Sequence, residues 1–360
     1  YKCLDTANLT GAFRIAIDVP SGVRSADGSI GGIAFAADTT LTVTAHKIGM
    51  LSYPARFFCG KIEVLDIGVP QEVLESYRNE NPGFVPDDEF VADALPPRPE
   101  ISNKGDFGKL ACLCGSENMT GAAVLSVGAA LRAGTGLVTL ASEKSVIDCV
   151  RHTYPEPIYA PLDWQDKAKI SAFGASLAKY SAVLIGCGWG QGAAKADFLK
   201  SALTTANTRF VLDADGINLL VPFIDMLREA KKTPNPGEFA RMTGLDVTDV
   251  NDNRIKYAVE FAERYRCVLV LKGAGTITAS PDGRFAVNTT GNPGLAKGGS
   301  GDVLAGLIAG LAANPQISAF DAAVCGVYLH GKAADNLKEA YSEYGYLPSQ
   351  LALEVAKLLP

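Results

Sequence analysis

The chain has 360 residues, 48% of them hydrophobic and 20% charged, which is long enough for two domains or for one large α/β domain. Its formal charge of −6 disfavours nucleic acid as the main partner, because a phosphate backbone requires a clustered basic surface. No apolar stretch approaches the roughly 20 residues that span a bilayer. The start of the chain does not resemble a signal peptide, and eight scattered cysteines predict a reduced, cytoplasmic protein.

The first hundred residues predict a small α/β segment. Three strands are expected, at 14–18, 40–44 and 61–66, and the first of them is expected to be buried and to end in Asp18. Residues 71–103 contain proline and glycine clusters that interrupt any periodicity. A linker is therefore placed at 76–96, between a domain at 1–75 and a domain at 97–360.

Strands and helices alternate in the second part of the chain. The pattern predicts a helix at 119–133, a hairpin at 276–288, helices from residue 300 onward and strands at 110–113, 137–141, 182–185, 210–212 and 268–271. This alternation predicts a mostly parallel sheet covered on both faces. In such sheets ligands bind beyond the carboxyl ends of the strands, so the glycines and aspartates there are the candidate site residues.

The glycine-rich run from Thr290 to Asp302 carries the strongest chemical signal. It holds five glycines and leads directly into a helix from Val303. Free N–H groups and the positive end of the helix dipole at such a junction form an anion hole for a transferring phosphoryl group. Asp302 is placed to take a proton from an attacking hydroxyl. The alternative is that Asp302 only caps the helix.

A second signal follows a predicted buried strand. Lys272-Gly273-Ala274-Gly275-Thr276 combines one cation with two glycines and a threonine, which suits a nucleotide phosphate or ribose. A tight turn into the hairpin is the alternative. The spacing is not that of a P-loop, so a P-loop fold is disfavoured.

These two segments, with Thr233 to Ala240 and Met119 to Ala123, resemble the ADP/ATP-dependent NAD(P)H-hydrate dehydratase family over about residues 97–360. The resemblance implies a ribokinase-like fold, with a partial Rossmann-like α/β segment preceding it. It also implies a repair reaction, in which ADP or ATP phosphorylates the C6 hydroxyl of (6S)-NADHX or NADPHX and loss of phosphate restores NADH or NADPH. Mg²⁺ is the expected metal.

The same resemblance assigns roles to individual residues. It implies that Asp302 faces the substrate hydroxyl and that Asn235 contacts the substrate, although the family usually has His in place of Asn235 and of Asn103. Glu238 either starts a helix or helps to organise metal and phosphate. The implied nucleotide contacts are Lys272, Gly273, Ala274, Gly275, Thr276 and Gly301, and the remaining implied substrate contacts are Gly121, Ala122, Gly188 and Gly190.

Residues 11–70 resemble the second half of an NAD(P)H-hydrate epimerase domain. This resemblance implies that Asp18 meets the substrate, that Ser21 helps to hold a potassium ion and that Lys47 belongs to the same site, with His46 in place of the usual proline. The first half of that domain has no counterpart here. We therefore expect an N-terminally truncated bifunctional protein that exposes apolar edges and lacks competent epimerase activity.

Several assignments stay open. His152 is expected in a solvated loop and His330 as a structural histidine, while Asp213 and Asp215 either touch Mg²⁺ or substrate or cap the next helix. A vitamin or small-alcohol kinase of the same superfamily and a non-catalytic nucleotide-binding scaffold are the alternative functions. The sequence does not decide between ADP and ATP, between NADHX and NADPHX, or between a monomer and a homo-oligomer.

Overall fold

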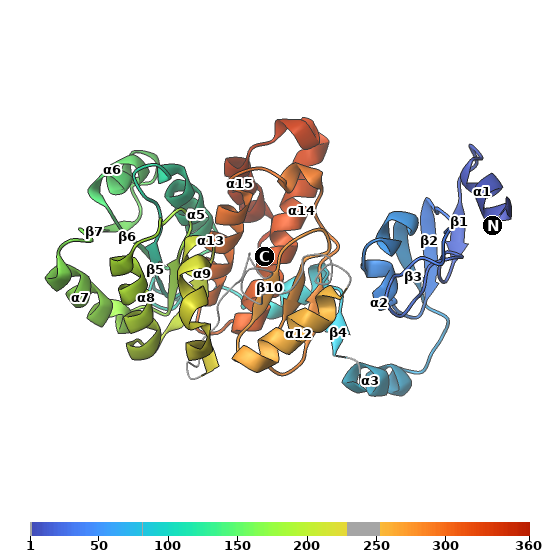
Figure 1. Ribbon diagram of the computed structural model, residues 1–360, viewed down its shortest axis with the longest axis horizontal. Helices are drawn as coiled ribbons and strands as arrows, with labels where there is room; N and C mark the ends of the chain where they lie inside the picture. The colour runs from blue at the N-terminus through green and yellow to red at the C-terminus, as the bar shows by residue number, and fades with distance from the viewer. Residues whose placement is uncertain (1, 81, 229–252) are drawn as a thin grey trace. The chain divides into compact units, whose positions relative to one another are not determined.

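The computed structural model describes residues 2–80, 82–228 and 253–360, and the chain divides into two compact units (Figure 1). The first unit comprises Tyr1–Val85 and Leu245–Arg254, and the second comprises Pro86–Gly244 and Ile255–Pro360. The motif from 233 to 240, with Asn235 and Glu238, lies outside the described residues. Among the described residues, no helix is both long enough and apolar enough to cross a bilayer.

The first unit is built on a parallel sheet of three strands in the order β1-β2-β3. Its elements are α1 (Lys2–Asn8), β1 (Ile15–Ile17), β2 (Thr39–Val43), α2 (Ile48–Leu51), η1 (Ala55–Phe58), β3 (Lys61–Leu65), α3 (Gln71–Glu80) and β4 (Gly83–Phe84). The three predicted strands are therefore confirmed.

The burial predicted for the first strand is wrong. Side chains alternate across a strand, and only Ala16 points to the buried face, whereas Ile15 and Ile17 are 51% and 66% exposed. Ile15 and Ile17 pair with Thr39 and Leu41 of β2, so the exposed side chains share one face of the sheet. This exposure confirms the expectation that the segment leaves apolar side chains uncovered.

The second unit contains the predicted parallel sheet, with five strands in the order β7-β6-β5-β8-β9, and an antiparallel ladder β10-β11-β12. Its strands are β5 (Lys109–Leu113), β6 (Leu137–Ser142), β7 (Ile158–Pro161), β8 (Ala182–Ile185), β9 (Arg209–Leu212), β10 (Leu269–Leu271), β11 (Ile277–Ala279) and β12 (Phe285–Val287). The predicted hairpin is confirmed as β11–β12.

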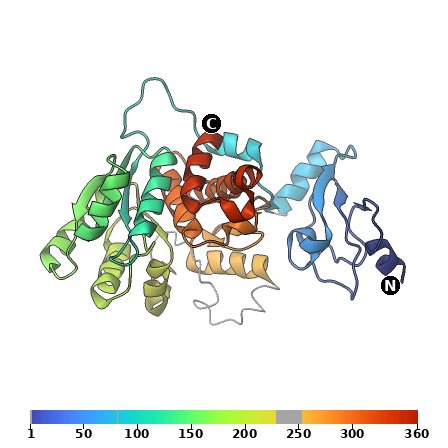
Figure 2. The same ribbon diagram turned by 90° about the horizontal axis from the view of Figure 1, so that it is seen from above.

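Helices flank the five-stranded sheet on both faces, with α5 on one side and α8 and α9 on the other (Figure 2). The helical segments are α4 (Asp88–Ala94), α5 (Thr120–Arg132), α6 (Lys144–Thr153), α7 (Lys167–Ser176), η2 (Leu177–Lys179), α8 (Ala193–Thr205), α9 (Asp215–Leu220), η3 (Val221–Arg228), α12 (Arg254–Tyr265), η4 (Pro293–Leu295), α13 (Ser300–Ala313), α14 (Ala319–Gly345) and α15 (Pro348–Leu358). Helices α3 and α4 occupy much of the 71–103 stretch, which the sequence predicted to be irregular. The cap of α4 explains the difference, because the Asp87 carboxylate accepts the Phe90 N–H at 2.9 Å and starts a helix between the prolines.

Small residues bring α13 against α5. A methyl group on Gly306 would lie 2.1 Å from the Ser126 carbonyl oxygen, so only glycine allows the two backbones to approach this closely. Helix α13 also packs on β5, β8 and β9, and nearly all of its side chains are buried. This packing fixes the start of α13 at the carboxyl ends of the parallel strands.

Candidate active site

The glycine-rich run ends where α13 begins. Gly299 holds the N-cap position with φ of 102°, a left-handed conformation that favours glycine, and Asp302 lies in the first helical turn. The alternative reading of Asp302 as the helix cap is therefore wrong. Asp302 belongs to the helical turn whose N–H groups have no partner within the helix, and such N–H groups can stabilise an anion.

The surroundings of Asp302 favour its protonated form. Burial, followed by repulsion from Asp213, raises the pKa of Asp302 to about 6, although Lys272 and the Cys187 thiol oppose this shift. A carboxylate with a pKa near neutrality is a better general base than one with an ordinary pKa. A proton-accepting role for Asp302 stays a prediction, and this environment is compatible with it.

Lys272 and Asp213 form an ion pair at the same place. Lys272 follows β10 and Asp213 follows β9, and their Nζ and Oδ1 atoms are 2.5 Å apart. Burial, the largest single effect, lowers the pKa of Lys272, but attraction and a hydrogen bond to Asp213, together with the charges of Cys187 and Asp302, raise it overall. A methyl group on Gly301 would lie 3.6 Å from Lys272 Nζ, so two of the predicted nucleotide contacts meet at the start of α13.

The alternatives for the two aspartates are also resolved in part. Asp213 does not cap α9, because Ala214 occupies the N-cap position, and its carboxylate is 3% exposed. Asp215 accepts a hydrogen bond from the Gly190 N–H at 2.7 Å and so holds the turn that follows β8.

Some of the residues predicted as substrate contacts lie together. A methyl group on Gly188 would lie 2.7 Å from the Ala122 Cβ, so the turn after β8 touches the first turn of α5, which also contains Gly121. Two residues that sequence reasoning missed border Gly190: the Ser116 Oγ would lie 3.8 Å, and the Lys195 Nζ 3.5 Å, from a methyl group placed there. Neither residue belongs to a recognisable motif. Ser116 precedes α5 and Lys195 lies in α8, so only the fold brings them to the same turn.

A network that the sequence did not reveal holds the glycine-rich run. The Asp335 carboxylate accepts hydrogen bonds from the Gly291 N–H at 2.8 Å and from the Asn292 side-chain amide at 3.0 Å. The Tyr346 hydroxyl donates to Asn292 Oδ1 at 3.0 Å. Lys297 donates to backbone carbonyls near the end of α14, among them that of Tyr346 at 2.7 Å. Helix α14 and the turn after it therefore position the loop.

The structure also places the histidines and Asn103. His330 is 6% exposed, and burial lowers its pKa to about 4, so the imidazole is neutral, as befits the predicted structural role. His152 is exposed as expected, but it ends α6 instead of lying in a loop. Asn103 is exposed and accepts the Gly105 N–H in a local turn.

In the first unit, the structure brings Asp18 and Lys47 together. Lys47 Nζ lies 2.5 Å from Asp18 Oδ1, and this hydrogen bond lowers the pKa of Asp18. Ser21 is exposed, and its carbonyl accepts the Phe35 N–H at 2.8 Å. His46 is largely buried, with a pKa lowered by burial.

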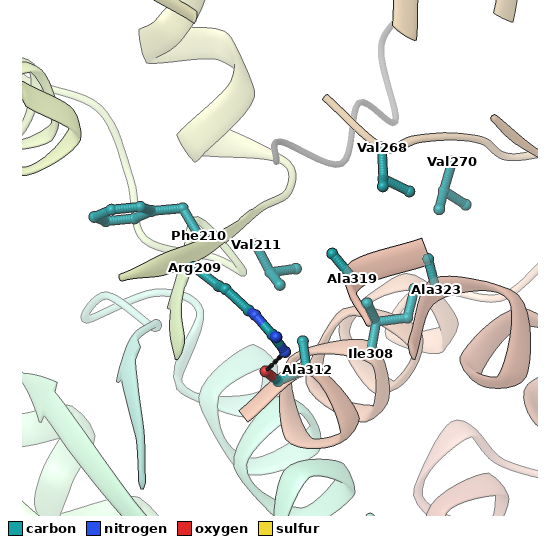
Figure 3. A pocket seen from close by; sticks show the side chains of 9 residues that line it. All are labelled: Arg209, Phe210, Val211, Val268, Val270, Ile308, Ala312, Ala319 and Ala323. Carbon is teal, nitrogen blue, oxygen red and sulfur yellow. Dashed lines mark hydrogen bonds between the residues drawn. The ribbon is translucent and has the colours of Figure 1, made fainter. Parts of the chain in front are cut away.

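A pocket in the second unit lies away from the site residues (Figure 3). It is lined by Val211 of β9, Val268 and Val270 near β10, and apolar side chains of α13 and α14. Arg209 crosses it to donate to the Ala312 carbonyl at 2.9 Å. None of the predicted site residues lines this pocket.

Comparison with known families decides the assignment. A family model described as NAD(P)H-hydrate dehydratase matches residues 110–357, which is more than half of the chain. The chain belongs to the NAD(P)H-hydrate dehydratase family. A second model, described as YjeF-related protein N-terminus, matches residues 1–49, in agreement with the expectation of an epimerase-like segment before the dehydratase domain.

Individual relatives of the dehydratase family agree with this assignment. The chain is 34% identical, over 89% of its length, to the bifunctional NAD(P)H-hydrate repair enzyme Nnr of Moorella thermoacetica, and spans 62% of that protein. A crystal structure of ADP/ATP-dependent NAD(P)H-hydrate dehydratase from Bacillus subtilis, co-crystallized with ATP/Mg²⁺, is 31% identical, with a TM-score of 0.64 over 76% of this chain and 96% of that one. A ribokinase-like superfamily protein from Enterococcus faecalis is 24% identical, with a TM-score of 0.68 over 78% of this chain and 96% of that one, and supports the fold alone.

Proposed function

We propose that this chain dehydrates (6S)-NADHX or NADPHX to NADH or NADPH at the expense of ADP or ATP. The observation that carries the proposal is the position of Asp302, a carboxyl with a pKa raised to about 6, in the first turn of α13 and beside Gly301, Lys272 and Asp213. Transfer of a phosphoryl group to a hydroxyl needs a proton acceptor for the hydroxyl and N–H donors for the charge on the phosphate, and the start of α13 provides both kinds of group.

The proposed reaction has two steps. In the first step, Asp302 removes the proton of the C6 hydroxyl while the hydroxyl oxygen bonds to the terminal phosphorus. The bond between that phosphorus and the leaving nucleotide breaks. Phosphate then leaves C6 with the bonding electron pair, the C5–H electron pair forms the C5–C6 double bond, and the C5 proton passes to solvent. The N–H groups at the start of α13 and the Lys272 ammonium stabilise the charge on the transferring group.

The roles of the other predicted contacts follow from where they lie. Lys272 to Thr276 and Gly301 are proposed to bind the nucleotide, because Lys272 reaches the start of α13. Gly121, Ala122, Gly188 and Gly190 are proposed to bind the nicotinamide nucleotide, because the turn after β8 meets the start of α5. Asn235 is proposed as a further substrate contact on the resemblance alone.

Mg²⁺ is proposed to enter with the nucleotide. Among the described residues, no group of three or more His, Cys, Asp or Glu side chains is arranged to hold a metal ion. Mg²⁺ commonly binds through substrate phosphates with one or two carboxylates and retained waters, so the absence of such a group fits a nucleotide-borne ion. When bound, the ion neutralises charge on the donor phosphates.

The test is an assay of NADH formation from NADHX with ADP and, separately, with ATP. The proposal expects NADH to form with at least one donor. A vitamin-alcohol kinase would instead phosphorylate an alcohol such as hydroxyethylthiazole and form no NADH. A nucleotide-binding scaffold would do neither.

We also propose that the epimerase-like segment is not catalytically competent in this chain. Asp18 and Lys47 meet, but the sheet around them has three strands and an exposed face that carries Ile15 and Ile17. Potassium binding by Ser21 is kept as a proposal on the resemblance alone. Conversion of (6R)-NADHX to the S form by this chain would contradict the inactivity.

A further inference from the structure

Strands β9 and β10 belong to different hydrogen-bonded sheets, although side chains from both line one pocket (Figure 3). The proposed substrate contacts lie in the turn after β8 and in the first turn of α5, and β8 is the sheet neighbour of β9. The proposed nucleotide contacts from Lys272 to Thr276 follow β10. The proposed site therefore combines residues from two sheets, at a boundary where β9 and β10 are not hydrogen-bonded neighbours.

The ion pair between Asp213 and Lys272 crosses this boundary at the carboxyl ends of the strands. The two charged atoms are 2.5 Å apart, and Asp213 is 3% exposed. A methyl group on Gly301 would lie 3.6 Å from Lys272 Nζ and 4.0 Å from Asp213 Oδ2. The pair thus lies directly against the start of α13, where the transferring phosphate is proposed to bind.

We infer that Asp213 is a positioning residue for phosphoryl transfer, which acts by holding the Lys272 ammonium against the start of α13. This inference rests on the proposed function. A lysine side chain has a flexible four-carbon stem, so its ammonium can reach many positions. A buried carboxylate fixed at the end of β9 restricts Nζ to one of them, and pre-organised charge is what such a site requires.

Asp213 should also influence the acid–base behaviour of the site, because its charge acts on Asp302. The charged or titratable groups that face Asp302 are Asp213 after β9, Lys272 after β10 and Cys187 after β8. His330 of α14 faces Lys272 and is neutral at ordinary pH. Removing the Asp213 charge removes a repulsion, so the pKa of Asp302 should fall.

The experiment compares the wild type with Asp213→Asn, Lys272→Met and the double variant. Asp213→Asn should lower kcat about 10- to 100-fold, as displacement of a reacting group does, while the KM for NADHX changes little. The acid limb of kcat/KM should move to lower pH. Because Asp213 acts through Lys272, adding Asp213→Asn to Lys272→Met should lower kcat little further. Asp282→Asn, which breaks an exposed ion pair with Arg284, is the matched control and should be fully active.

Full additivity of the two substitutions, or an Asp213→Asn enzyme with unchanged kcat and pH profile, would overturn the inference. If Asp213→Asn does not fold, the double variant, which removes both partners of the ion pair, is compared with Lys272→Met instead, and a further large loss of kcat overturns the inference. If the wild type forms no NADH, the proposed function fails separately. Calorimetric ADP binding then tests the inference. Asp213→Asn and Lys272→Met are expected to weaken ADP binding equally. The inference is contradicted if Lys272→Met weakens ADP binding and Asp213→Asn does not.

Discussion

Gly188 lies against Ala122 so closely that a methyl group on Gly188 would come within 2.7 Å of the Ala122 Cβ. This contact joins the turn after β8 to the first turn of α5, two places more than sixty residues apart in the chain. Gly188 also has φ of 57°, where a side chain is strained. Both features tie the shape of the proposed substrate site to a single glycine.

Gly188→Ala should therefore raise the KM for NADHX and lower the free energy of unfolding by about 1–2 kcal/mol from backbone strain alone. Steady-state kinetics and urea unfolding measure the two effects. Gly174→Ala is the matched control. Gly174 lies inside α7, and a methyl group there makes an ordinary 3.5 Å contact with Phe198 of α8. A Gly188→Ala enzyme with normal KM would remove this turn from the substrate site.

Asp302→Asn should lower turnover by roughly 10² to 10⁴, the usual contribution of a general base, with little change in nucleotide affinity. Asparagine keeps the size of the side chain but cannot accept the hydroxyl proton at neutral pH. Single-turnover NADH formation and calorimetric ADP binding measure the two quantities. Unchanged turnover would exclude Asp302 from the chemistry.

The pH dependence of kcat/KM should report the same carboxyl. The pKa of Asp302 is raised to about 6, so the base is protonated and inactive below that value and becomes competent as the pH rises through it. The acid limb should disappear in the residual activity of Asp302→Asn. A wild-type limb near the ordinary aspartate value of 3.8 would contradict a base whose pKa is raised to about 6.

Asp302 should also reduce stability at neutral pH. Its pKa is higher in the folded chain than the ordinary 3.8, so folding favours the protonated form, and the cost is absent below the ordinary value and complete above about 6. The shift corresponds to roughly 3 kcal/mol, which exceeds the roughly 0.3–1 kcal/mol that a charge at a helix start contributes. Asp302→Asn should therefore unfold at higher urea than the wild type at neutral pH, with the difference shrinking as the pH falls towards 4. A less stable variant at neutral pH would contradict this electrostatic account.

The sequence predicted most strands of the second unit because buried β-strands are continuous apolar runs, and Ala182–Ile185 matches its predicted bounds. The glycine-rich start of α13 was also predictable, because the glycines and Asp302 lie next to each other in the chain. The ion pair of Asp213 with Lys272 was not, since the two residues are far apart in sequence and meet only when β9 and β10 are placed side by side.

Two features of the structure could not be predicted from the sequence, for different reasons. The pattern of β1 predicts a buried strand, but periodicity says which side chains share a face and not whether anything covers that face, and Ile15 and Ile17 are exposed. The network of Asp335 with Gly291 and Asn292 escaped detection because an aspartate inside a long helix carries no distinctive signal.

The central claim is that the start of α13 receives the phosphate that is transferred. A crystal structure of the chain with Mg²⁺, a non-hydrolysable ATP analogue and NADHX tests it most directly. The account predicts the terminal phosphate within hydrogen-bond distance of the backbone N–H groups at Gly301 and Asp302, with the C6 hydroxyl beside the Asp302 carboxylate. A terminal phosphate bound away from Gly299 to Asp302 would contradict it.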